Sequence, residues 1–189
     1  MTVRMTLLAA AAGATRREVR FEDDAPLDER GLLRARQQAP SLPAVRQTYA
    51  APSLRCRQTA EAMGLTAVTA PELAACSMGR WRGRTLDEVA AQEQEAVAAW
   101  LADPAAAPHG GESLLALRDR VGSWLDCRPA VEEGRVLVVA DQTVIRAALV
   151  HALGLPPQTF WRLDVEPLAA VELSGRLGRW NLRLSPAGR

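Results

Sequence analysis

The sequence alternates short apolar runs with segments whose apolar residues recur at helical spacing, and this alternation constrains the fold more than any other feature. Residues 5–12 are a largely apolar run that ends at Gly13, and residues 135–140 are a run rich in β-branched side chains. Both patterns are typical of strands buried on two faces. Because strands that alternate with helices usually form one layered sheet, we expect an α/β fold with a mostly parallel central sheet flanked by helices.

The remaining predicted elements keep this alternation. A first helix is expected after Asp28, whose side chain suits an N-cap. Further helices are predicted at 54–63, 85–100, 113–125 and 143–153. Further strands are predicted at 49–52 and 68–73, and a hairpin pair at 168–173 and 180–184. Neither an internal repeat nor a linker interrupts the pattern, so residues 1–189 are predicted to be a single domain.

Composition excludes several classes of function. A formal net charge of +1 provides no electrostatic case for nucleic acid or an anionic membrane as partner. No run approaches the roughly 18 apolar residues of a membrane span, and a cytoplasmic protein is predicted, with a short signal peptide at the N-terminus as the alternative. The three cysteines include no C-x-x-C pair, so we expect reduced thiols, no metal site and no cofactor.

Several short motifs follow one another in a recognisable order. They are Pro26-Leu-Asp-Glu-Arg-Gly31, Ala50-Ala-Pro-Ser-Leu-Arg55 with Gln58-Thr-Ala-Glu61, Gly79-Arg-Trp-Arg-Gly83, Pro108-His-Gly-Gly-Glu-Ser113 with Arg120-Val121, and the predicted strand, turn and helix over 136–146. In this order and spacing the chain resembles the histidine phosphatase superfamily, also called phosphoglycerate mutase-like. The small alpha-ribazole phosphatase group looks most similar. The resemblance covers nearly the whole chain and implies a three-layer phosphoglycerate mutase-like fold.

The resemblance also implies a reaction through a phosphohistidine, in which a histidine attacks, arginines and a second histidine bind the phosphoryl oxygens, and a carboxylate protonates the leaving group. The resemblance assigns the family's five catalytic positions to five residues of this chain: the first arginine corresponds to Ala11, the nucleophilic histidine to Ala12, the second arginine to Arg55, the acid to Ala75 and the second histidine to Asp141. Only Arg55 keeps the identity that the family requires, so the catalytic set is degenerate and is not intact as a set.

Asp141 adds a repulsive charge to this loss. At ~4 Å and an effective dielectric constant near 20, two like unit charges repel by about 4 kcal/mol. A phosphate would therefore be attracted by Arg55 and repelled by Asp141. We favour an ion pair between these two residues over Arg55 acting as an anion ligand, and Asp141 also suits the N-cap of the helix that follows.

The candidate pocket or ligand-binding residues are Gly13, Thr15, Arg55, His109, Glu112, Asp141 and Gln142. His109 is expected at the rim of the pocket, whereas His151 is expected to be structural. The Gly110-Gly111-Glu112-Ser113 segment is consistent either with ligand binding at a helix N-terminus or with a turn and cap. The tryptophans are expected to be core or half-buried packing residues, with a tryptophan-lined cleft as the alternative. A migrated nucleophile such as Thr15 or Cys56 is disfavoured.

These patterns favour a catalytically inactive histidine phosphatase-like protein, a pseudoenzyme with a binding or regulatory role through the altered pocket or the surface. The alternative is a phosphatase- or phosphomutase-type hydrolase with residual or altered activity on a small phosphorylated metabolite. The sequence weighs against an enzyme because Ala12 has no nucleophilic atom. The expected partner is an unidentified small molecule or protein, and a homodimer is left open.

Overall fold

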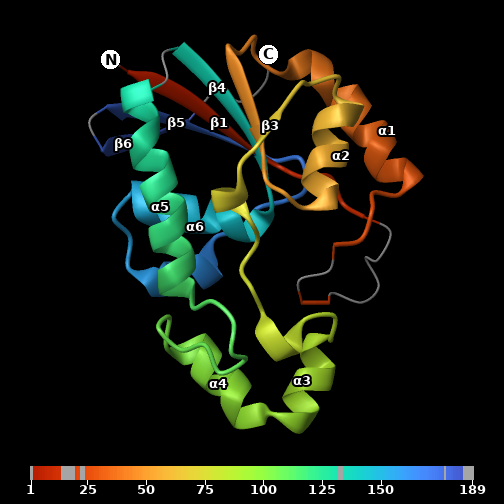
Figure 1. Cartoon of the computed structure of the whole chain (residues 1–189), viewed down its shortest axis with the longest axis vertical. Helices are drawn as coiled ribbons and strands as arrows, with labels where there is room; N and C mark the ends of the chain where they lie inside the picture. Colours follow the sequence, from red (N-terminus) through yellow and green to blue (C-terminus); the bar gives the residue numbers. More distant parts are fainter. Residues whose placement is uncertain (1, 14–19, 22–23, 132–133, 177, 185–189) are drawn as a thin grey trace.

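A six-stranded sheet lies at the centre of the computed structural model, which describes residues 2–13, 20–21, 24–131, 134–176 and 178–184 (Figure 1). The strand order is β3-β2-β4-β1-β5-β6. The strands are β1 Val3–Ala9, β2 Gln47–Ala50, β3 Val68–Thr69, β4 Gly134–Ala140, β5 Ala170–Arg176 and β6 Arg179–Arg183. The first four strands pair in parallel, while β5 and β6 pair antiparallel, as the predicted hairpin requires. The expected mostly parallel sheet is confirmed.

The two central strands β1 and β4 end at the same edge of the sheet. They run parallel in register, with Ala9 opposite Ala140. The predicted strand over 5–12 is too long at its end, because the backbone leaves the ladder after Ala9: the Ala11 N–H donates instead to the Thr59 side-chain oxygen, at 3.0 Å. This departure brings residues 10–13 beside Asp141, which follows β4 directly.

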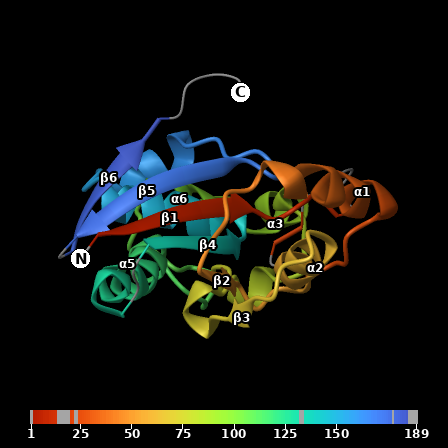
Figure 2. The same ribbon diagram turned by 90° about the horizontal axis from the view of Figure 1, so that it is seen from above.

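The described residues form six α-helices. They are α1 Glu29–Gln38, α2 Leu54–Ala62, α3 Leu86–Gln92, α4 Gln94–Ala102, α5 Leu114–Val131 and α6 Gln142–Ala152. Figures 1 and 2 show α5 with α6 and α1 with α2 as two separate pairs, with the strands running between them. Helices α3 and α4 lie apart from the sheet, at the lower end of Figure 1. The predicted N-cap is confirmed, since Asp28 accepts a hydrogen bond from Gly31 N–H at 2.6 Å.

Two predicted elements are wrong in detail. The helix predicted over 85–100 is broken at Glu93, whose φ of −137° and ψ of 46° are not helical, so α3 and α4 are separate. The strand predicted over 68–73 pairs only at Val68 and Thr69. Pro71 begins a 3₁₀ helix there, and a proline has no N–H to donate to the sheet.

Within the described parts of the chain, none of the helices combines the length and apolar character needed to cross a membrane.

Candidate functional site

A cavity of about 620 Å³ opens beyond the carboxyl ends of β1 and β4, where parallel α/β sheets usually bind ligands. Its volume lies within the usual range for small-molecule sites. The lining residues come from the segments that follow β1 and β4, from residues 20–21 and 75–78, from α2, α4, α5 and α6, and from the segment after α6. They include the small residues of the floor, Ala10, Ala11, Ala12, Gly13 and Ala75, and the charged residues Arg20, Arg55, Arg146, Asp141, Asp164 and Glu166.

The floor of the cavity is held by residues of the motifs described in the sequence. Thr59 accepts from Ala11 N–H at 3.0 Å and donates its own hydroxyl to Arg55 C=O at 2.7 Å, which ties the floor to α2. Gly13 has to be glycine, because a Cβ there would lie 2.9 Å from the carbonyl oxygen of Pro26. The segment is therefore fixed in place although its side chains carry no chemistry.

Two further motif residues hold the loop before α1 against this floor. A Cβ on Gly31 would lie 2.3 Å from the Ala12 carbonyl oxygen, so only glycine permits α1 to approach so closely. Gln58 on α2 accepts a hydrogen bond from Leu27 N–H at 2.8 Å. These motif residues thus build the scaffold around Ala12 through contacts to the backbone.

Arg55 and Asp141 form an ion pair across the floor, with 3.3 Å between Arg55 Nη2 and Asp141 Oδ1. The Asp141 side chain is 9% exposed and that of Arg55 is 33% exposed. Asp141 occupies the N-cap position of α6, but its side chain makes no capping hydrogen bond. Its carboxylate is directed to Arg55 instead, so the side chain does not take the capping role considered from the sequence.

The neighbouring thiol is unsuited to replace the missing nucleophile. Cys56 is completely buried. Burial, followed by the nearby Asp141 charge, raises the pKa of Cys56 well above its ordinary value. Because the thiolate is the reactive form of cysteine, this residue stays an unreactive thiol. Thr15, the other residue considered for this role, lies outside the described residues.

Neither of the two candidates from the 109–113 segment reaches the cavity. His109 is 1% exposed, packs against Trp81 at 5.0 Å between ring centroids, and accepts from Gly111 N–H through Nδ1 at 3.0 Å. The expected rim position is therefore not observed, because the loop turns inward. Glu112 pairs with Arg120, with 2.7 Å between Oε2 and Nη2. Neither residue lines the cavity.

The Gly110–Ser113 segment serves as a turn and cap. Ser113 Oγ accepts from Ala116 N–H at 3.1 Å in the first turn of α5. His151 is likewise tied into the structure: its Nε2 lies 2.9 Å from Asp126 Oδ2, and the same carboxylate accepts from Trp180 Nε1 at 2.9 Å. No histidine of the described residues lines the cavity. No group of three or more metal-ligating side chains was found among them either.

An aromatic wall is the main feature that the sequence reasoning underestimated. The cavity is lined by Phe21, Trp100, Phe160 and Trp161. These rings come from segments as far apart as residue 21 and residue 161, so no local motif signals them. The alternative of a tryptophan-lined cleft matches Trp100 and Trp161. Trp100 is nevertheless buried in the core, as are Trp81, Trp124 and Trp180, and Trp161 is half-buried, so the expected packing role is also observed. Arg146, Asp164 and Glu166 also line the cavity and were not singled out from the sequence.

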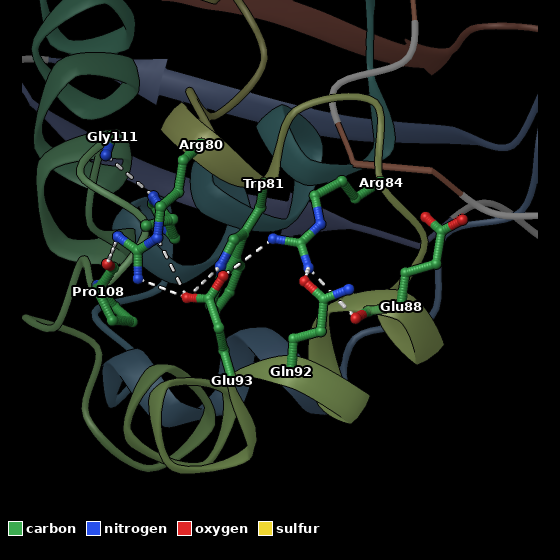
Figure 3. A network of polar contacts seen from close by, with 9 residues as sticks. Arg80, Trp81, Arg84, Glu88, Gln92, Glu93, Pro108 and Gly111 are labelled. Carbon is green, nitrogen blue, oxygen red and sulfur yellow. Dashed lines mark hydrogen bonds and ion pairs between the residues drawn. The ribbon is translucent and has the colours of Figure 1, made fainter.

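A polar network centred on Glu93 supports this wall from behind (Figure 3). The Glu93 carboxylate accepts hydrogen bonds from Arg80 Nε at 3.1 Å, Trp81 Nε1 at 3.2 Å and Arg84 Nη1 at 2.9 Å. Trp81 in turn packs edge to face on Trp100, with centroids 5.7 Å apart. The break between α3 and α4 at Glu93 is what places this carboxylate among the two arginines.

Because of this network, we expect the stability of the fold to decrease at acidic pH. Hydrogen bonds from Arg80 first, and from Trp81 next, lower the pKa of Glu93 from 4.5 to about 2. Because the folded-state pKa is depressed, the stabilisation is complete above pH 4.5 and is lost as the pH falls toward 2. Glu93→Gln is expected to remove this contribution, so the urea midpoint of the variant should fall less steeply over that pH interval. Glu95→Gln, at an exposed acid of α4, is the control and should retain the parent's slope. Equal slopes in Glu93→Gln and the parent would contradict the prediction.

Comparison with known proteins agrees with the fold. The model of the histidine phosphatase superfamily (branch 1) matches residues 10–186. The chain belongs to the histidine phosphatase superfamily.

Among its relatives, a glucosyl-3-phosphoglycerate phosphatase of Mycolicibacterium vanbaalenii is 32% identical across 55% of this chain. The match covers 57% of that relative, so the chain spans little more than half of its length. A solved mycobacterial glucosyl-3-phosphoglycerate phosphatase superposes with a TM-score of 0.85 over 100% of both chains, at 24% identity. A putative alpha-ribazole-5'-P phosphatase from Escherichia coli gives a TM-score of 0.85 at 21% identity, over 96% of this chain and 95% of that one. These two likenesses establish the fold.

Proposed function

We propose that this chain is a non-catalytic member of the superfamily that binds a small molecule in the altered cavity without transferring a phosphoryl group. The observation that carries the proposal is the composition of the floor. Ala11, Ala12 and Ala75 line it, and none of them offers a nucleophile, a cation or an acid. The retained Arg55 is engaged by Asp141.

The cavity itself supports a binding role. Its volume of about 620 Å³ is kept although the catalytic side chains are absent. Its floor is held by Thr59, Gly13 and Gly31 through backbone contacts that do not depend on catalysis. A scaffold that keeps a defined cavity and lacks the reacting groups is suited to recognise a ligand and release it unchanged.

Hydrolysis of 4-nitrophenyl phosphate tests the proposal. We expect no release of 4-nitrophenolate above the buffer rate between about pH 5 and about pH 8, since loss of a covalent nucleophile typically costs several orders of magnitude in rate. Arg55→Ala is assayed in parallel. Turnover in the parent that disappears in Arg55→Ala would overturn the proposal, because it would require the family's phosphoryl-binding arginine.

The alternative function is hydrolysis of a small phosphorylated metabolite through a displaced nucleophile. It is supported by the named activities of the relatives and by two side chains with nucleophilic atoms on the cavity wall, Cys76 and Thr143. Turnover that persists in Arg55→Ala and disappears in Cys76→Ala or Thr143→Val would establish this alternative. Turnover unchanged in every variant would come from a contaminating hydrolase.

A further inference from the structure

The charged groups of the cavity leave an excess of acidic side chains once their pairs are made. Arg55 is bound to Asp141. Arg20 donates to Gly83 C=O at 2.8 Å and lies 3.7 Å from Glu88, so it is engaged beyond the cavity wall. Among the described lining residues, one arginine then remains, Arg146, whose guanidinium carbon lies 5.9 Å from the centroid of the Phe160 ring. Two exposed carboxylates, Asp164 and Glu166, line the same cavity, and neither forms an ion pair within the described chain. The charges left unpaired among these residues are therefore acidic by one, which favours a cationic ligand.

A buried acceptor lies at the floor of the same cavity. Asp141 is 7% exposed, and its Oδ2 atom accepts no hydrogen bond among the described residues. Only the other oxygen, Oδ1, is bound by Arg55. A buried carboxylate oxygen without a donor is costly. Oδ2 is closed to solvent, so a turn of the Asp141 carboxylate toward the cavity that it lines would let the N–H of a ligand supply the missing donor.

The aromatic wall presents ring surfaces in different directions. Trp100 and Trp161 have centroids 4.6 Å apart at 76°, and Phe160 and Trp161 have centroids 5.1 Å apart at 85°. Phe21 meets Trp100 at 5.7 Å and 87°. Nearly perpendicular aromatic rings around a cavity suit an apolar body, and their faces attract organic cations.

Other classes of ligand match only some of these three features, which are the excess acidic charge, the buried acceptor and the aromatic rings. A phosphate ester would bring its negative charge toward Asp141, Asp164 and Glu166. A neutral aromatic alcohol would use the rings and donate one hydrogen bond, but it would leave the excess acidic charge uncompensated. An ammonium ion donates to the carboxylate, compensates the charge and interacts with the rings.

We propose that the cavity binds an organic ammonium ion whose protonated amine is directed to Asp141 and whose apolar, ring-bearing body packs against Trp100 and Trp161. This assignment rests on the proposed non-catalytic function and specifies its ligand class.

The test uses three probes that share one ring: benzylammonium, benzyl alcohol and benzyl phosphate, each titrated calorimetrically into the full-length chain near neutral pH. We expect benzylammonium to bind about tenfold more tightly than benzyl alcohol, and benzyl phosphate to bind most weakly. Asp141→Asn and Trp161→Leu should each weaken benzylammonium binding by about five- to tenfold. Glu166→Gln, at an exposed residue that makes no ion pair within the described chain, should weaken it by about two- to threefold and is the variant least able to disturb folding.

Asp119→Asn is the matched control, because it makes the same isosteric change at an exposed residue that does not line the cavity. Equal affinity for benzylammonium and benzyl alcohol, or unchanged benzylammonium binding in both Asp141→Asn and Glu166→Gln, would overturn the ligand class. Absence of binding by every probe would also overturn the ligand class, but it would not contradict the proposed non-catalytic function. Release of phosphate from benzyl phosphate in an Arg55-dependent way would instead overturn the proposed function.

Discussion

A chain carrying Ala11→Arg, Ala12→His, Ala75→Glu and Asp141→His together is expected to hydrolyse 4-nitrophenyl phosphate at least about 10³-fold faster than the parent. The four substitutions return the nucleophile, one cationic phosphoryl ligand, the acid and the second histidine that the family uses. They also release Arg55, which is held by Asp141 in the parent at 3.3 Å.

The structure supports this gain because the backbone of the site is in place. Residues 11, 12, 75 and 141 all line one cavity, so the four new side chains would start from the wall of the same site. The ends of β1 and β4 are adjacent, with Ala9 paired with Ala140. Position 12 is fixed by the approach of Gly31 to its carbonyl oxygen, so a histidine there would start from a defined backbone.

The informative control is the triple variant that retains Ala12. It restores the phosphoryl ligands and the acid without a nucleophile, so it should bind vanadate and show a higher melting temperature in its presence, yet hydrolyse no substrate. If the triple and quadruple variants had the same rate, the missing histidine would not be what limits this chain. The proposed non-catalytic role would then lose its main support.

Gly111→Ala is expected to destabilise the fold by more than about 3 kcal/mol, because its new Cβ would overlap backbone atoms that have no room to move. That Cβ would lie 2.0 Å from Ser77 C=O and 2.8 Å from Gly79 N. The two loops are also bonded to each other there, since Ser77 C=O accepts from Glu112 N–H at 2.8 Å. Urea unfolding monitored by tryptophan fluorescence measures the loss.

A substitution of the adjacent glycine, Gly110, distinguishes the effect of this clash from the effect of backbone strain. Gly110 has a φ of +76°, but a Cβ there would meet nothing within 4 Å. Gly110→Ala should therefore cost only about 1–2 kcal/mol, the usual penalty of the left-handed conformation. If both variants lost the same small amount, the close packing of the 77–79 and 109–112 loops would not be the reason that this motif contains two glycines.

Local patterns predicted the order of the elements well. The buried strand at Gly134–Ala140, the N-cap at Asp28 and the antiparallel pair β5 and β6 were all visible in the sequence, because hydrophobic periodicity and capping act over a few residues. The break at Glu93 was not visible. Glu93 binds arginines at positions 80 and 84, which lie outside the predicted helix, so no helical pattern within 85–100 can reveal these contacts.

In the candidate site, too, some features follow from local sequence patterns and others depend on tertiary packing. The loss of catalytic groups at Ala11, Ala12 and Ala75 could be read directly from the motif order. The pairing of Arg55 with Asp141 could be anticipated because both positions belong to one family pocket. His109 and Glu112 could not be placed, since the direction in which a loop turns depends on what it packs against: Trp81 for His109 and Arg120 for Glu112.

By itself, therefore, the sequence determined the family, the α/β fold and the absence of a nucleophile at position 12, because each depends on residue identity in a local pattern. Only the tertiary structure decided what remains in the cavity. Its aromatic wall joins rings from residues 21, 100, 160 and 161, and its buried acceptor is an oxygen of Asp141 that Arg55 leaves unbound. Such features arise from long-range packing, which brings together residues that have no common sequence signal.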